Sequence, residues 1–121
     1  MTVILWIINA LLALSFFGAG VMKLSRKRDA IISSGMGWAN DFSSTSVKLI
    51  GLAEALGALG LILPLATGIA SILTPIAAGC LTVLMLGAVV VHIRRHEPAT
   101  PALVLALVAL VSAVLGFLVV L

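Results

Sequence analysis

Long apolar stretches and short polar segments alternate along the whole chain. Four stretches, 3–22, 46–65, 68–91 and 100–121, contain at most two charged residues each. A helix of about 20 residues spans the hydrocarbon core of a bilayer, which is about 30 Å thick. Backbone groups that face lipid must be satisfied within their own segment, so each stretch is predicted to be a transmembrane helix. The pattern therefore predicts an all-α membrane protein in which residues 1–121 form a single four-transmembrane-helix bundle.

The composition agrees with this pattern. Of the 121 residues, 63% are hydrophobic and 9% are charged, whereas a typical soluble domain has about 25% charged residues. The first stretch is not predicted to be a cleaved signal peptide, because a basic cluster that begins at Lys23 follows it and no Lys or Arg precedes it. These features exclude an ordinary water-soluble domain and make the lipid bilayer the first expected partner.

The positive charges indicate an orientation. All seven Lys and Arg residues flank the connection after the first stretch or the connection after the third, and basic residues collect in cytoplasmic loops. Residues 23–45 and 92–99 are therefore predicted to be cytoplasmic, and both termini are predicted to be extracytoplasmic. This topology accounts for the net charge of +3 without a nucleic-acid partner.

The connection 23–45 is the only long segment outside the four stretches. It combines a short apolar run with glycines, polar residues and two aromatic residues, Trp38 and Phe42. Because Trp is enriched at the headgroup level of membranes, the segment either lies in the interface and partly covers the cytoplasmic mouth of the bundle, or is an ordinary connection anchored by Trp38. Ser43 or Ser44 is expected to cap the next helix, since a hydroxyl oxygen accepts from its free N–H groups.

Small residues indicate the faces along which the helices pack, because transmembrane helices approach closely where side chains are small. In the second stretch these positions are Gly51, Ala55 and Ala58. In the fourth stretch they follow a spacing of four and three: Ala102, Ala106, Ala109, Ala113 and Gly116. A homo-oligomer is expected because a bundle this small offers little lining for a pocket, and the seam on the fourth stretch could serve either the bundle or a second copy.

Glu54 is the one carboxylate with apolar sequence on both sides for the length of a helix. An ionisable side chain at the centre of a membrane helix costs roughly 2.5–3.5 kcal/mol on insertion scales, so a partner is expected. Helical spacing places Asn9 and Lys23 on one face of the first helix, and His92 at the cytoplasmic end of the polar face of the third. Lys23, Glu54 and His92 are therefore predicted to converge in the cytoplasmic leaflet.

Two interpretations of this group are open. Lys23 and Glu54 can form a buried ion pair that holds the helices in register, or the group can be a polar site for a proton or for the head of a lipid-soluble ligand, since intramembrane ionisable residues often mark function. The candidate ligand-binding residues are then Lys23, Glu54, His92, Trp38 and Asn9. Lys48 is an alternative partner for Glu54.

The sequence offers no redox centre of its own. Haem needs an axial ligand such as His within a span, and a metal centre needs several His, Cys or carboxylate side chains together. His92 and His96 are four residues apart and lack a third ligand, so no metal site is predicted. Cys80 is alone in its stretch and is interpreted as a small buried apolar residue.

Three segments carry a resemblance to known proteins. The first stretch ends in Gly18-Ala-Gly20-Val-Met-Lys23-Leu24, the second contains Gly51-Leu-Ala-Glu54-Ala-Leu-Gly57, and the third ends in Leu86-Gly-Ala-Val-Val-Val-His92. In order and spacing, over nearly the whole chain, they resemble the DoxX-like family of small bacterial membrane proteins. The positions that match the motifs of that family are Gly20, Lys23, Gly51, Glu54, Gly57, Pro64 and His92.

The resemblance implies a four-helix bundle in the bacterial cytoplasmic (inner) membrane, with relatives named as subunits of quinol oxidase or thiosulfate:quinone oxidoreductase systems. It suggests a quinone as ligand and a soluble or membrane redox protein as partner. One expected function is a non-catalytic bundle that binds a quinone or similar lipid, or that serves as such a membrane subunit. The alternative is a small intramembrane enzyme that acts on an apolar substrate, with Glu54 as catalytic acid or base and His92 as its partner. Ion conduction is disfavoured because only one acid lies within a span.

Overall fold

The computed structural model describes residues 1–121, and its only regular elements are helices, with no strand. The long helices are α1 (Thr2–Ser25), α3 (Ser44–Thr67), α4 (Leu73–Arg94) and α5 (Thr100–Val120). A short helix α2 (Arg28–Ser33) and a 3-10 helix η1 (Gly37–Asp41) lie between α1 and α3. Each of the four long helices is long and apolar enough to cross a membrane, so the predicted all-α membrane fold is confirmed.

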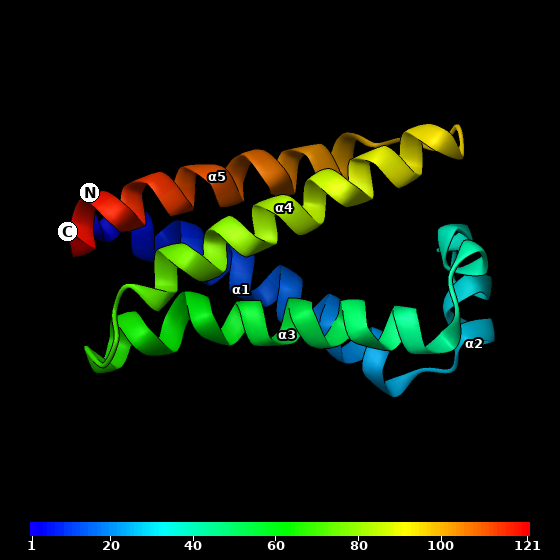
Figure 1. The fold of residues 1–121 in the computed structure, drawn as a ribbon, viewed down its shortest axis with the longest axis horizontal. Coiled ribbons are helices and arrows are strands. Elements are labelled where there is room, and N and C mark those ends of the chain that lie inside the picture. The colour runs from blue at the N-terminus through cyan, green and yellow to red at the C-terminus, as the bar shows by residue number, and fades with distance from the viewer.

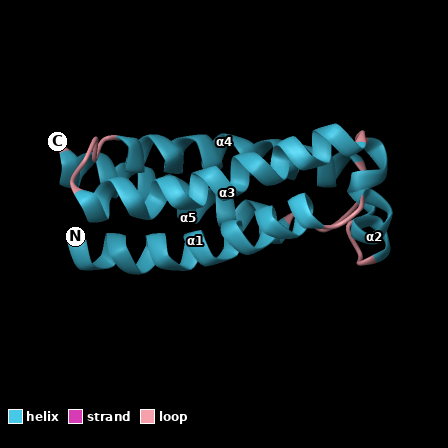
Figure 2. Ribbon diagram, turned by 90° about the horizontal axis from the view of Figure 1, so that it is seen from below, coloured by secondary structure: helices cyan, strands magenta, loops and turns pink.

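The four long helices form a ring in which each packs against two others. Helices α1 and α4 each pack against both α3 and α5. Both termini and the α3–α4 turn lie at one end of the bundle, whereas α2, η1 and the α4–α5 connection lie at the other (Figure 1, Figure 2). We call the second end the basic end, because it carries Lys23, Arg26, Lys27, Arg28, Lys48, Arg94 and Arg95.

The helix ends follow local backbone chemistry. Ser43 caps α3, because its hydroxyl oxygen accepts from the Ser46 N–H at 3.1 Å, as predicted. The third long helix begins at Leu73, later than the predicted start at residue 68. Gly68 ends α3 with a left-handed backbone (φ 71°), and Ala70 also has a positive φ of 50°. The apolar run between these helices is therefore a turn, which hydrophobicity alone does not distinguish from helix.

The seam of small residues on α5 faces the interior of the bundle, where all five of its members are buried. A Cβ atom on Gly116 would lie 2.9 Å from the Cβ of Pro75 in α4, so these helices are in close contact. The seam thus serves the bundle itself. The interpretation of Cys80 as buried is wrong: Cys80 is exposed, because Ala78 and Leu81 occupy the inner face of α4 and Cys80 falls on the outer one.

Candidate functional site

Helices α1 and α3 touch backbone to backbone near the basic end. A Cβ atom on Gly20 would lie 2.6 Å from the Gly51 carbonyl oxygen, and a Cβ atom on Gly51 would lie 2.7 Å from the Lys23 Cβ. A larger residue at either position would push the helices apart. Lys23 is about one turn from Gly20, and Glu54 is about one turn from Gly51. The glycine contact therefore brings the lysine to the face of α3 that carries the carboxylate.

Lys23 and Glu54 form a buried ion pair. The Lys23 Nζ donates a hydrogen bond to Oε1 of Glu54, and the two residues are only 7% and 2% exposed. The ammonium also lies 5.6 Å from the centre of the Trp38 ring, within the range of a cation–π interaction. The other carboxylate oxygen, Oε2, accepts no hydrogen bond from the protein. The pair offsets the cost of placing a carboxylate in hydrocarbon and leaves one acceptor free.

Lys48 has a different role. Its Nζ donates to the carbonyl oxygens of Lys23, Leu24 and Arg26 at 2.8, 2.9 and 2.5 Å. The last carbonyls of a helix have no partner within the helix, and a lysine beside them satisfies them and complements the helix dipole. Since all three ammonium donors are used at the end of α1, Lys48 is not the partner of Glu54.

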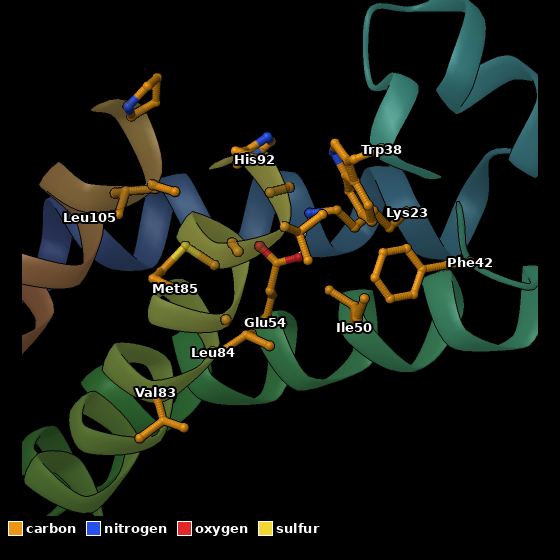
Figure 3. A pocket seen from close by; sticks show the side chains of 16 residues that line it. Lys23, Trp38, Phe42, Ile50, Glu54, Val83, Leu84, Met85, His92 and Leu105 are labelled. Carbon is orange, nitrogen blue, oxygen red and sulfur yellow. Dashed lines mark hydrogen bonds and ion pairs between the residues drawn. The ribbon is translucent and has the colours of Figure 1, made fainter. Parts of the chain in front are cut away.

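A cavity of about 550 Å³ lies between the helices at the basic end. Its walls are mostly apolar and include Ile50 of α3, Leu84, Ala88 and Val91 of α4, and Leu105 of α5. Four side chains that the sequence singled out also line it: Lys23, Glu54, His92 and Trp38 (Figure 3). The volume falls in the range of small-molecule sites, about 300–1,000 Å³. The structure thus brings four of the five candidate ligand-binding residues to one cavity.

His92 lies at the outer end of this cavity, away from Glu54. Gly57 packs against Leu81, since a Cβ on Gly57 would lie 2.7 Å from a Leu81 methyl carbon. Helices α3 and α4 are antiparallel, so Glu54, one turn before Gly57, is level with Leu84, one turn after Leu81. His92 follows Leu84 by eight residues along α4 and therefore lies roughly 12 Å further toward the basic end. The His92 Nδ1 lies 3.3 Å from Oε1 of Glu97. His92 and Glu54 share the cavity but not a hydrogen bond.

The segment around η1 covers the basic end of the cavity. Trp38 and Phe42 both line the cavity and pack edge to face, with ring centres 5.8 Å apart. The Arg28 Nε donates to the Phe42 carbonyl oxygen at 2.8 Å, and Arg95 pairs with Asp41 at 2.7 Å. The hydrogen bond that Arg95 donates to the Asp41 carboxylate raises the pKa of Arg95 above its ordinary value. Of the two interpretations of residues 23–45, this geometry favours the covering segment.

The structure does not bring Asn9 to the cavity. Asn9 is fully buried, its Nδ2 donates to the Leu61 carbonyl oxygen at 3.0 Å, and its Oδ1 accepts from the Ser112 hydroxyl at 2.5 Å. These bonds connect α1, α3 and α5. Asn9 does share an inward face with Lys23, but it lies about 21 Å away along the helix.

The apolar part of the cavity lining was not predicted from the sequence. Phe42, Ile50, Leu84 and Leu105 line the cavity, yet each lies in or beside a stretch that is apolar on most faces. Such stretches contain no periodic signal that separates core, cavity and lipid-facing positions. The two small residues Gly87 and Ala88, shortly before His92, are the one feature that could have indicated open space there.

The chain matches one protein-family profile. Comparison with curated proteins and with solved structures finds no match. The profile of the DoxX-like family matches residues 7–115, a range that contains α3 and α4 completely and every polar residue of the cavity. Together with the four helices that can cross a membrane, this match shows that the chain is a multi-pass membrane protein that belongs to the DoxX-like family.

Proposed function

We propose that this protein binds the polar head of a lipid-soluble small molecule, such as a quinone, in the cavity at the basic end. The observation that carries the proposal is the pairing of two features inside one membrane bundle. One is a largely apolar cavity of about 550 Å³, and the other is the Lys23–Glu54 ion pair in its wall. Few apolar cavities contain such a pair by accident, because buried charges are costly wherever they occur.

The ion pair suits an uncharged head group. A lysine has three N–H donors, and only one of those of Lys23 is used by Glu54. A ligand carbonyl can therefore accept from Lys23, while a ligand hydroxyl can donate to the free Oε2 of Glu54. The pair has no net charge, so a charged head group would introduce an uncompensated charge into a low-dielectric site. Quinone carbonyls and quinol hydroxyls both meet these requirements.

A purely structural ion pair explains less of the geometry. Protein interiors are close-packed, with few voids larger than a water molecule. A pair that only held α1 and α3 in register would need no cavity beside it, and the Gly20–Gly51 contact already holds these helices together. The acid/base enzyme also has weaker support, because His92 is near Glu97 rather than Glu54.

The location of the basic end in the cytoplasm belongs to the same proposal. All seven Lys and Arg residues lie there, and basic residues collect on the cytoplasmic side of bacterial and other cell membranes. The ligand head would then lie in the cytoplasmic leaflet, where a redox partner on that side could reach it.

Native mass spectrometry of the protein purified in micelles tests the proposal. We expect a bound lipid-soluble molecule on the unmodified chain. In Glu54→Gln, which keeps the shape and removes the charge, occupancy should fall about tenfold, because a hydrogen bond to a charged group contributes about 1.5 kcal/mol or more. The matched control is Asp29→Asn, since Asp29 is exposed on α2. Unchanged occupancy in a folded Glu54→Gln protein would contradict the proposal. The same spectra report the oligomeric state and any tightly bound partner.

A further inference from the structure

Helices α3 and α4 separate toward the basic end. They are in close contact where Gly57 meets Leu81, and from there the two ribbons diverge (Figure 1). Beyond this contact the cavity is lined from both helices, with Ile50 on α3 and Leu84 on α4 (Figure 3). The cavity therefore occupies the space between two diverging membrane helices.

Part of the cavity wall is the outer surface of α4. Val83 and Gly87 both line the cavity and are both exposed, Val83 to 68%. Val83 lies near the middle of α4 (Leu73–Arg94), about 15 Å from either end of the helix. That depth corresponds to the hydrocarbon core of a bilayer. This part of the cavity wall is thus exposed at the depth of the acyl chains.

At the basic end, unlike on the outer surface of α4, the cavity is covered by the η1 segment. Trp38 and Phe42 line it from the η1 segment, and this segment is held by the Arg28 and Arg95 contacts with its backbone and with Asp41. A molecule that approached from water at this end would meet Trp38, Phe42 and the contacts that hold them in place. A molecule in the bilayer meets only the exposed apolar surface around Val83 and Gly87.

We propose that the ligand reaches the cavity laterally from the bilayer between α3 and α4, and that its hydrocarbon tail passes over Gly87 and Val83 into the lipid. This inference rests on the proposed function and deepens it. The ligand class becomes an uncharged amphiphile with a long chain, whose head meets Lys23 and Glu54. Gly87 is the specificity-determining position, because a Cβ atom there would meet no atom within 4 Å and the missing side chain leaves the path of the tail open.

Quenching of Trp38 fluorescence provides a direct test. Trp6 and Trp38 are the two tryptophans of the chain, so in a Trp6→Phe background the emission comes from Trp38 alone. The probes are two primary alcohols brominated near the hydroxyl group, one with a long chain and one with a short chain, added to the protein in phosphatidylcholine vesicles. Bromine quenches tryptophan on contact, and the saturable part of the quenching measures occupancy of the cavity.

Gly87→Leu places a side chain in the path of the tail, and its Cβ atom meets no other atom within 4 Å. We expect it to weaken saturable quenching by the long-chain alcohol about tenfold, which corresponds to about 1.4 kcal/mol, and to leave the short-chain alcohol unaffected. The matched control is Gly79→Leu, because Gly79 is on the same helix, also meets no atom within 4 Å, and does not line the cavity. Gly87→Ala gives a smaller effect of the same kind should the leucine variant fail to fold.

The outcomes separate this inference from the proposed function. Undiminished long-chain binding in Gly87→Leu, equal loss in Gly79→Leu, or loss of both probes in Gly87→Leu would overturn the lateral route. The proposed function would stand in those cases if Glu54→Gln weakened the saturable quenching about tenfold relative to the unmodified protein. No saturable quenching by either probe would overturn the proposed function and the lateral route with it.

Discussion

Replacing Lys23 with methionine tests how strongly the bundle depends on the ion pair. Methionine keeps an unbranched chain and removes the ammonium. Glu54 is 2% exposed and accepts its only hydrogen bond from Lys23, so the carboxylate would lose its partner inside hydrocarbon. Breaking a buried pair from one side costs about 3–5 kcal/mol, and an unpaired acid in a membrane helix costs roughly 2.5–3.5 kcal/mol. We expect Lys23→Met to lower the free energy of unfolding by about 3 kcal/mol.

The double variant Lys23→Met/Glu54→Met removes both charges at once. Apolar replacement of a whole buried pair is often neutral or stabilising, so the double variant should recover most of the stability that Lys23→Met loses. The coupling energy between the two positions is expected to be about 2–3 kcal/mol. A coupling energy of this size would come from the unpaired Glu54 charge. Packing lost at position 23 cannot explain it, because the single and the double variant both contain Lys23→Met.

The free energy of unfolding can be measured by titration with sodium dodecyl sulfate in mixed micelles, followed by far-ultraviolet circular dichroism. Lys27→Met is the matched control, because Lys27 is an exposed lysine at the same end of the bundle and its replacement should change stability by no more than about 0.5 kcal/mol. Equal destabilisation of the single and the double variant would refute the reasoning, because the loss would then not depend on the stranded carboxylate.

Two further substitutions test the packing and the limits of the cavity. Gly20→Leu should destabilise the bundle by about 1–3 kcal/mol, because a Cβ atom there would lie 2.6 Å from the Gly51 carbonyl oxygen. The control is Gly18→Leu, which should be neutral in the same titration because a Cβ atom on Gly18 would meet no atom within 4 Å. Equal effects of the two substitutions would argue against a specific glycine contact. Asn9→Leu should lower the free energy of unfolding by about 1 kcal/mol, because Asn9 makes two hydrogen bonds to other helices and each such bond contributes about 0.6 kcal/mol on average. Ligand occupancy in native mass spectra of Asn9→Leu should be unchanged, and its loss would contradict the position of Asn9 outside the cavity.

The convergence of Lys23 and Glu54 could be predicted because it follows from helical periodicity and from the scarcity of charge, but the sequence left Lys48 open as an alternative partner of Glu54. A carboxylate within a span needs a cation, and the structure decided for Lys23 because Lys48 donates to the carbonyl oxygens at the end of α1. The positions of Asn9 and His92 were harder to predict. A helical face repeats every 3.6 residues, whereas the depth at which two helices are level depends on where they cross. Here the Gly57–Leu81 contact places His92 beyond hydrogen-bond reach of Glu54.

The amino-acid sequence by itself determined the four membrane helices and the gathering of positive charge at one end, because the bilayer acts on each segment separately through length, apolarity and backbone hydrogen bonding. The tertiary structure alone decided that α3 and α4 diverge, that a cavity forms between them, and that η1 covers its basic end. The physical reason is that these helices are apolar on nearly every face, so periodicity does not distinguish core, cavity and lipid-facing positions. Those roles depend on a few close contacts, such as Gly20 with Gly51 and Gly57 with Leu81, which join residues far apart in the chain.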